Sequence, residues 1–284
     1  MSFPLDHLPD PRKILTKENR GAKKSLGQNF LVNRGILEKI ASSMSGGPRS
    51  WVIEVGPGLG HLTFLLCQTH SHVVAVEKEE ALAASLPERL QAYQDRVQVH
   101  QVDVMEADVE SMVPQKVPGY EVVGNLPFYC STQILFHFLE KAPRAQKLVF
   151  MFQREVAQRI LAKPSSKIYG ALTVSCAAQA TVRSLFKVSA GSFHPRPDVD
   201  AEVIEIRPKK GRLHGRTLET LRSLLRVSFS ARRKKLKNAL QKGGLWDELL
   251  EVGGKEVERL AGLRPDAVSP EQYLSLVSFL NSRC

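Results

Sequence analysis

Hydrophobic and polar residues alternate along the chain in two patterns. Short runs rich in Val, Ile and Phe predict buried strands, and longer segments with apolar residues three and four apart predict helices. The predicted strands are 51–55, 72–77, 97–103, 120–125, 147–153, 181–189 and 201–207. The predicted helices among them are 33–45, 62–68, 79–93, 132–141, 154–162 and 170–180.

This alternation predicts an α/β fold with a Rossmann-like, mostly parallel seven-stranded sheet and helices on both of its faces. Ligands of such a sheet bind beyond the carboxyl ends of its strands. From about residue 208 onward only helices are predicted, at 214–229, 232–242, 246–251, 253–261 and 270–281. We therefore expect an extended or loosely ordered basic arm at 1–24, a ligand-binding domain at 25–208 and a small all-helical domain at 209–284.

Composition narrows the class of protein. No stretch approaches the roughly 18 apolar residues of a membrane-spanning helix, and the first residues lack the apolar core of a signal sequence. The four cysteines are scattered without a CxxC pair, which argues against a zinc site and against a disulfide scaffold. We expect a cytoplasmic protein without a metal and without a membrane partner.

The net charge of +11 and the isoelectric point near 9.6 indicate a polyanionic partner. The charge is uneven, because residues 209–284 hold 16 Lys and Arg against 8 Asp and Glu. A solvated basic face is the plain interpretation, but this clustering favours nucleic-acid phosphates.

A glycine-rich turn follows the first strand in the segment EVGPGLG, residues 54–60. Gly56 and Gly58 would let the backbone turn tightly and approach a ligand. An ordinary strand-to-helix turn and a dinucleotide site remain alternatives, although the spacing here is GxGxG. The turn has neither a P-loop Lys-Ser/Thr pair nor any basic residue, so a triphosphate or pyrophosphate fits poorly.

Acidic residues stand at the ends of three successive predicted strands, and this pattern is more specific than the glycines. They are Glu54, Glu77 and Asp103. Glu77 is placed to accept hydrogen bonds from ribose hydroxyls, and Asp103 is placed to meet an adenine amino group. A ligand with a ribose and an adenine but no phosphate is indicated, and S-adenosylmethionine (SAM) fits better than NAD.

Eight segments in order complete the pattern. They are KSLGQNFLVN (24–33), EVGPGLGHLT (54–63), VEKE (76–79), VDVME (102–106), NLPF (125–128), QREVAQRI (153–160), FHPRPDVDA (193–201) and SFSARRKKLKNAL (228–240). Together they resemble the KsgA family of ribosomal RNA adenine dimethyltransferases, from about residue 13 to the C-terminus. The resemblance implies a SAM-dependent enzyme that dimethylates the N6 amino groups of two adjacent adenosines. In that family these lie in the hairpin near the 3′ end of small-subunit rRNA, within a pre-30S-type particle.

The resemblance also implies site residues. The cofactor would contact Asn29, Leu31, Gly56, Glu77, Asp103 and Asn125, with Gln28 lining the site. A plainer interpretation of the QNFL segment, which holds Asn29 and Leu31, is structural. Asn33 would cap the following helix, and Phe30 and Leu31 would pack in the core.

The NLPF segment carries the chemistry that the family implies. The Asn125 side-chain oxygen and the Leu126 carbonyl would accept the N6 hydrogens of the target adenine, and Pro127 would stiffen the turn. Phe128 and Phe193 would stack on the flipped base from opposite faces. Without the resemblance, the sequence around Phe193 favours an aromatic residue of the core. The family usually has Tyr where this chain has Phe128, so the hydroxyl is lost while the stacking face remains, and Tyr129 follows.

A basic run supplies the expected RNA contacts on a predicted helical stretch, although a solvated helix face is the alternative. Its cations are Arg232, Arg233, Lys234, Lys235 and Lys237. Two other functions stay open: a large-subunit rRNA adenine methyltransferase of the antibiotic-resistance type, and a non-catalytic ribosome assembly factor. A monomer is expected from the family.

Overall fold

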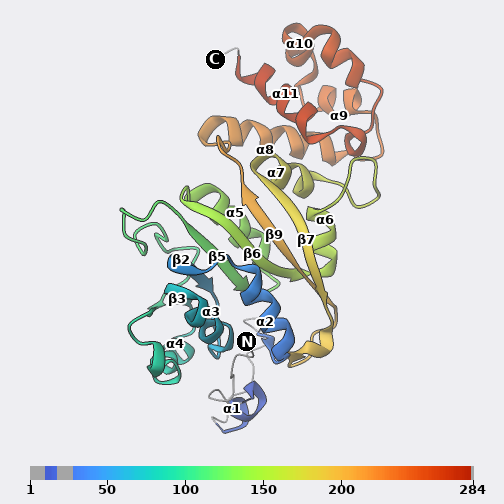
Figure 1. Cartoon of the computed structure of the whole chain (residues 1–284). Helices are drawn as coiled ribbons and strands as arrows, with labels where there is room; N and C mark the ends of the chain where they lie inside the picture. The colour runs from blue at the N-terminus through green and yellow to red at the C-terminus, as the bar shows by residue number, and fades with distance from the viewer. Residues whose placement is uncertain (1–9, 18–27, 283–284) are drawn as a thin grey trace. The chain divides into compact units, whose positions relative to one another are not determined.

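The computed structural model describes residues 10–17 and 28–282 (Figure 1). The chain forms two compact units. The first contains the described residues up to Ala157 together with Arg183–Arg207, and the second contains Gln158–Val182 and the described residues from Pro208 onward.

A seven-stranded sheet runs through the first unit in the order β4-β3-β2-β5-β6-β9-β7. Its strands are β2 (Gly47–Val55), β3 (His70–Glu77), β4 (Val97–Gln101), β5 (Tyr120–Asn125), β6 (Ala145–Gln153), β7 (Ala180–Val188) and β9 (Ala201–Pro208). Neighbouring strands from β4 to β6 are parallel, and β9 runs antiparallel to β6. This confirms the predicted mostly parallel α/β sheet. The central strands are mostly apolar, as expected of parallel strands buried on both faces.

Helices follow the strands much as predicted. They are α2 (Arg34–Ser43), α3 (His61–Thr69), α4 (Glu80–Arg89), α5 (Ser131–Lys141) and α6 (Arg154–Ile160). Helix α3 packs on β2 and β3, α4 packs on β3 and β4, and α5 packs on β6. The Asn33 side chain accepts a hydrogen bond from the Ile36 amide at 3.1 Å, which confirms the predicted cap of α2.

The N-terminal segment differs from the predicted extended arm where it is described. Residues 11–17 form helix α1 (Pro11–Lys17). Ile14 and Leu15 are buried in one apolar cluster with Leu59 and Leu82. Burial of these apolar side chains stabilises a helix in a segment that reads as polar overall. The rest of the predicted arm lies outside the described residues.

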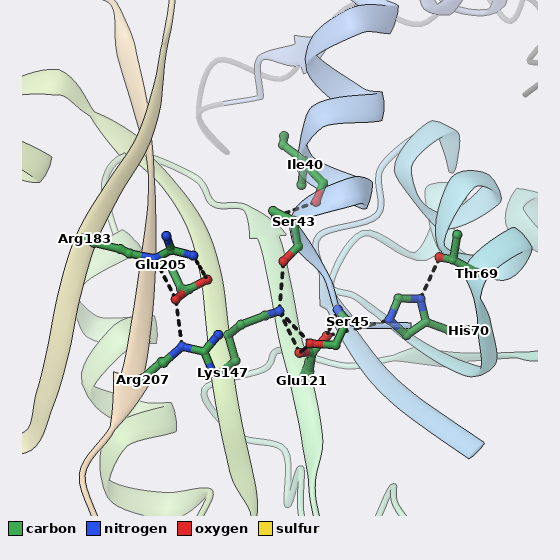
Figure 2. Close-up of polar contacts among 10 residues, drawn as sticks. All are labelled: Ile40, Ser43, Ser45, Thr69, His70, Glu121, Lys147, Arg183, Glu205 and Arg207. Carbon is green, nitrogen blue, oxygen red and sulfur yellow. Dashed lines mark hydrogen bonds and ion pairs between the residues drawn. The ribbon is translucent and has the colours of Figure 1, made fainter. Parts of the chain in front are cut away.

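A buried polar network holds the C-terminal end of α2 against the sheet (Figure 2). Lys147 on β6 is 3% exposed and forms an ion pair with Glu121 on β5 at 2.8 Å. Its ammonium also donates to the Ser43 carbonyl at 2.8 Å and to the Ser45 hydroxyl at 3.0 Å. Nε2 of His70 lies 3.8 Å from Glu121. The network ties α2, whose first residues follow the QNFL segment, to the start of three strands.

The second unit is helical. Its helices are α7 (Ala171–Gln179), α8 (Gly215–Ser230), α9 (Leu236–Lys242), α10 (Trp246–Leu260) and α11 (Pro270–Asn281). Two segments predicted as separate helices form α10, with a break in helical geometry at Gly254, where φ is 45°. No helix within residues 10–17 and 28–282 is long and apolar enough to cross a membrane.

The second unit contains more of the chain than the predicted interval 209–284, because residues 158–182 also belong to it. Tyr169 and Val174 belong to the same apolar core as Leu224 and Leu276. The Tyr169 hydroxyl donates to the Val268 carbonyl at 2.7 Å. The strand-and-helix pattern continues through 158–182 in the sequence, so only these long-range contacts reveal the grouping.

Candidate active site

A cavity lies at the carboxyl ends of β2, β3 and β5 and encloses about 1010 Å³ including its open mouth. This is where a parallel sheet binds ligands. Ten of the predicted site residues line it: Gln28, Asn29, Leu31, Gly56, Gly58, Glu77, Asn125, Leu126, Pro127 and Phe128.

The glycine turn forms one wall. The Gly56 amide donates to the Val76 carbonyl at 2.9 Å, which ties the turn to β3. Gly58 has a φ of 56°, and a Cβ there would lie 3.2 Å from the Phe30 ring. Both its backbone conformation and this close approach favour glycine at position 58.

Glu77 is fixed at the wall by the backbone. Its two carboxylate oxygens accept hydrogen bonds from the Gly58 amide at 3.1 Å and from the Glu79 amide at 2.9 Å. Burial raises the pKa of Glu77, and the backbone hydrogen bonds oppose that rise. The Gln28 side chain donates to the Glu79 carboxylate, which places Gln28 at the same wall.

Asn125 ends β5 and reaches across to the QNFL segment. Its Nδ2 donates to the backbone carbonyl of Asn29 at 3.1 Å. The next three residues of NLPF also line the cavity, and Phe128 is half-buried against the apolar core of the unit. The arrangement presents an amide oxygen, a backbone turn and an aromatic ring close together.

Asp103 is not part of the cavity wall. Its carboxylate forms an ion pair with the Lys78 ammonium at 2.7 Å and accepts from the Met105 amide at 2.9 Å. Burial opposes ionisation of Asp103, but these two partners hold its pKa below the usual range. Lys78 does line the cavity, so Asp103 contacts the wall through this ion pair.

Phe193 lies outside the cavity lining, and its stacking on a base stays a prediction. Phe193 is 4% exposed and lies in the core of the first unit. It belongs to β8 (Phe193–His194), which pairs antiparallel with β1 (Phe30–Leu31), and Leu31 lies opposite it. This pairing turns the ring inward, so its place in the core follows from tertiary contacts.

Several residues of the cavity wall were not predicted as site residues from the sequence. They include Phe30, Lys78, Glu79 and Tyr129. Each lies within two positions of a predicted site residue, and that proximity in sequence is the signal that could have found them. Tyr129 is exposed, at 57%. Glu54 was noted as an acid at a strand end without a role, and it also lines the cavity.

The five predicted RNA-binding cations lie in the second unit and differ in what they contact. They follow α8 on a turn and at the start of α9, whereas all five were predicted to lie within a helix at 232–242. Arg232 donates to the carbonyls of Lys167 and Ser166 at 2.5 and 3.3 Å, so it has a structural role. The Lys237 ammonium lies 5.4 Å from the centre of the Trp246 ring. Exposed on the turn are Arg233, Lys234 and Lys235.

Comparison with known proteins decides the family. Residues 19–281 match the family model described as ribosomal RNA adenine dimethylase. The chain belongs to this family. It is 36% identical over 264 residues to the ribosomal RNA small subunit methyltransferase A of Nitrosococcus oceani, covering 91% of this chain and 96% of that protein. The corresponding protein of Acinetobacter baylyi is 35% identical over 261 residues, with 92% and 93% covered.

Solved structures agree on the fold of the family. A dimethyladenosine transferase from Plasmodium falciparum superposes with a TM-score of 0.73 at 22% identity, covering 88% of this chain and 97% of that one. The 23S rRNA methyltransferase ErmE gives 0.65 at 26% identity, with 89% and 100% covered. Membership of the dimethylase family confirms the predicted enzyme class and SAM as its cofactor.

The residues present fit SAM. The close approach at Gly58 and the backbone-held carboxylate of Glu77 suit a ribose, and Oε2 of Glu54 is a buried acceptor without a hydrogen-bond partner among the described residues. Within those residues, no group of three or more His, Cys, Asp or Glu side chains is arranged to hold a metal ion.

Proposed function

We propose that this dimethylase modifies small-subunit rRNA, converting two adjacent adenosines of the 3′-terminal hairpin to their N6,N6-dimethyl forms during subunit assembly. The names of the relatives support the choice of subunit, since proteins called ribosomal RNA small subunit methyltransferase A cover more than nine-tenths of the chain. A single contact supports the chemistry: the hydrogen bond from Asn125 to Asn29 at the cavity wall.

That contact orients the Asn125 amide. A backbone carbonyl only accepts hydrogen bonds, so the amide must turn its NH2 group toward Asn29. Oδ1 is then the atom that can accept a hydrogen from a ligand. The Leu126 carbonyl would accept the second N6 hydrogen, and Pro127 restricts the backbone between the acceptor pair and Phe128.

The N6 amine needs orientation because its lone pair is delocalised into the adenine ring. Two acceptors that hold both hydrogens favour a pyramidal nitrogen and aim the lone pair. SAM, when bound, supplies a methyl group on a cationic sulfonium, which is electrophilic enough for direct attack by an oriented amine. The contribution of Asn125 and Leu126 is therefore position and electrostatics, and no strong general base is required.

The target base must leave its stack to enter the cavity. Phe128 lines the cavity and offers a ring face, and stacking of a base on an aromatic side chain contributes roughly 1–3 kcal/mol. The cofactor-contacting roles of Asn29, Leu31, Gly56, Glu77 and Asp103 form part of this proposal. Asp103 can take part once an adenine amino group competes with Lys78 for the Asp103 carboxylate. The cytoplasmic location and the monomeric state stay predictions.

The deciding experiment uses small ribosomal subunits from cells that lack the modification. The protein is incubated with these subunits and methyl-labelled SAM, and the RNA is digested for mass spectrometry of its nucleosides. Dimethyladenosine confined to the 3′-terminal hairpin supports the proposal. Labelling of large-subunit RNA alone would favour the second candidate, which the likeness to ErmE keeps open. Binding of subunits without any product would favour an assembly factor.

A further inference from the structure

Glu54 is the one acid of the three predicted strand-end carboxylates that the proposed function leaves without a role. It lies near the end of β2, is 2% exposed and lines the cavity. Its Oε2 is buried and finds no hydrogen-bond partner in the described part of the chain. A buried acceptor without a donor is unfavourable, so the site favours a ligand that supplies a donor or a charge.

The groups that face Glu54 do not supply that charge. From β3 it faces Glu77, and from α3 it faces Thr63 and Cys67. His61 at the start of α3 and Asn125 at the end of β5 share the cavity.

Lys78, which lines the cavity, and Arg96, which lies near Cys67, bind other groups. Lys78 pairs with Asp103, and Nη1 of Arg96 donates to the Cys67 carbonyl at 3.1 Å. Burial raises the pKa of Glu54 to about 8. The Thr63 hydroxyl offsets part of this rise, and Glu77 adds to it.

We propose that Glu54 is a proton-exchanging counterion for the cationic methionine portion of SAM. In the free protein Glu54 holds a proton, and when SAM enters, that proton leaves to solvent and the carboxylate faces the sulfonium and the ammonium. No other bond changes. SAM carries two positive charges and one negative charge, and an opposite charge nearby favours the ionised carboxylate. The inference rests on SAM as cofactor and is independent of which RNA is methylated.

The geometry separates this role from that of Glu77. Both Glu77 oxygens already accept backbone amides, which suits hydroxyl donors from a ribose at the end of β3. Glu54 lies one strand away, under the glycine turn, where its second oxygen has no donor among the described residues. Neighbouring strands would thus meet two chemically different parts of the same cofactor.

Calorimetric titration with SAM tests the inference directly. Titrations at about pH 7 in phosphate and in Tris, at matched ionic strength, differ in heat by the number of protons released multiplied by the difference in buffer ionisation enthalpy. We expect release of about one proton per SAM bound by the wild-type protein. Glu54→Gln should release almost none, whereas Glu88→Gln, which removes an exposed carboxylate on α4 outside the cavity lining, should release as much as wild type.

A neutral ligand provides the matched control. Methylthioadenosine keeps the ribose and the adenine but lacks both cationic groups, so it should bind without proton release. Equal heats in both buffers for SAM and wild type would overturn the inference while leaving the methyltransferase function intact. Undiminished release by Glu54→Gln would also overturn it, and failure of the wild type to bind SAM would overturn the cofactor as well.

A pH series on the unaltered protein covers the case in which Glu54→Gln does not fold. Proton release should be close to complete at about pH 7 and should fall steeply by about pH 9, where Glu54 is already ionised before SAM binds. Release that stays constant across this range would contradict the assignment to Glu54.

Discussion

The Asn125 side chain donates from Nδ2 to the backbone carbonyl of Asn29 at 3.1 Å, across 96 residues of sequence. The contact joins the NLPF turn to the QNFL segment and fixes which end of the amide faces the cavity. Replacement Asn125→Ala removes both the anchor and the acceptor. We expect subunit methylation to fall by about 10²–10³-fold in kcat, because the removed group is a preorganised acceptor at the reacting amine.

Two measurements make the Asn125 prediction specific. Affinity for the small subunit should stay within a few-fold of wild type, since the cations proposed to contact phosphates lie elsewhere. Asn125→Asp keeps an acceptor oxygen but cannot donate to Asn29, so its activity should lie between those of wild type and Asn125→Ala. Near-normal turnover by Asn125→Ala would contradict the assigned role.

Phe128 and Tyr129 should contribute differently. Phe128→Ala removes a ring that lines the cavity and packs on the core, and we expect the KM for RNA to rise about tenfold or more through lost stacking. Phe128→Tyr, which restores the hydroxyl usual in the family, should stay within a few-fold of wild type. Steady-state kinetics on purified subunits measures both. A large loss in Phe128→Tyr would show that this cavity is built around the missing hydroxyl.

Glu121 and Lys147 should behave as a buried pair. Glu121→Gln leaves the Lys147 ammonium buried without its counter-charge, so we expect a loss of about 3–5 kcal/mol in the free energy of unfolding, measured by urea denaturation. Glu121→Gln combined with Lys147→Met should recover much of that loss. Equal stability of the single variant and wild type would contradict this view of the network.

The same network predicts an acid limit to stability. Although burial opposes it, His70, Lys147 and Ser45 hold the pKa of Glu121 at about 2. The folded state therefore binds fewer protons than the unfolded state between the ordinary value of 4.5 and about 2. Stability from this group is present above pH 4.5 and is lost as the pH falls through that window. Denaturation of wild type at several acid pH values should show this loss, and the double variant should show less of it.

The raised pKa of Glu54 predicts that the stability of the folded state falls as the pH rises. Its folded pKa of about 8 exceeds the ordinary 4.5, so the folded state retains a proton that the unfolded state has released. Stability of the SAM-free protein should fall as pH rises from 4.5 to 8. Glu54→Gln removes this dependence and should be more stable than wild type at pH 8, on the order of a few kcal/mol. Parallel melting curves at pH 6 and pH 8 would reveal it, and an unchanged gap between the two proteins would contradict it.

The exposed cations of the turn after α8 should contribute to affinity and leave chemistry unaffected. Replacing Arg233, Lys234 and Lys235 with Ala should weaken subunit binding and lower the slope of log affinity against log salt by up to about 3. SAM affinity should not change. A control with the same charge loss at exposed Lys116, Lys141 and Lys255 should change the slope less. Equal slopes for the two triple variants would show that the turn has no special place in RNA binding.

Much of the fold followed from the sequence because its elements carry strong local signals. The strand predicted at 120–125 matches β5 residue for residue, and α11 matches its predicted span of 270–281. Parallel strands bring their carboxyl ends to one edge, so Gly56, Glu77 and Asn125 could be expected in one cavity before any contact was known.

Only the tertiary structure determined the burial, the partners and the pKa values of residues that contact distant segments. Phe193 is a core residue because β8 pairs with β1, and Arg232 is held by two carbonyls of a loop more than sixty residues earlier in the chain. Asp103 lies outside the cavity lining and pairs with Lys78, and burial raises the pKa of Glu54. Local pattern specifies which segments form strands and helices, whereas burial and pairing arise between segments far apart in sequence, so a residue's exposure and charge state emerge only in the folded chain.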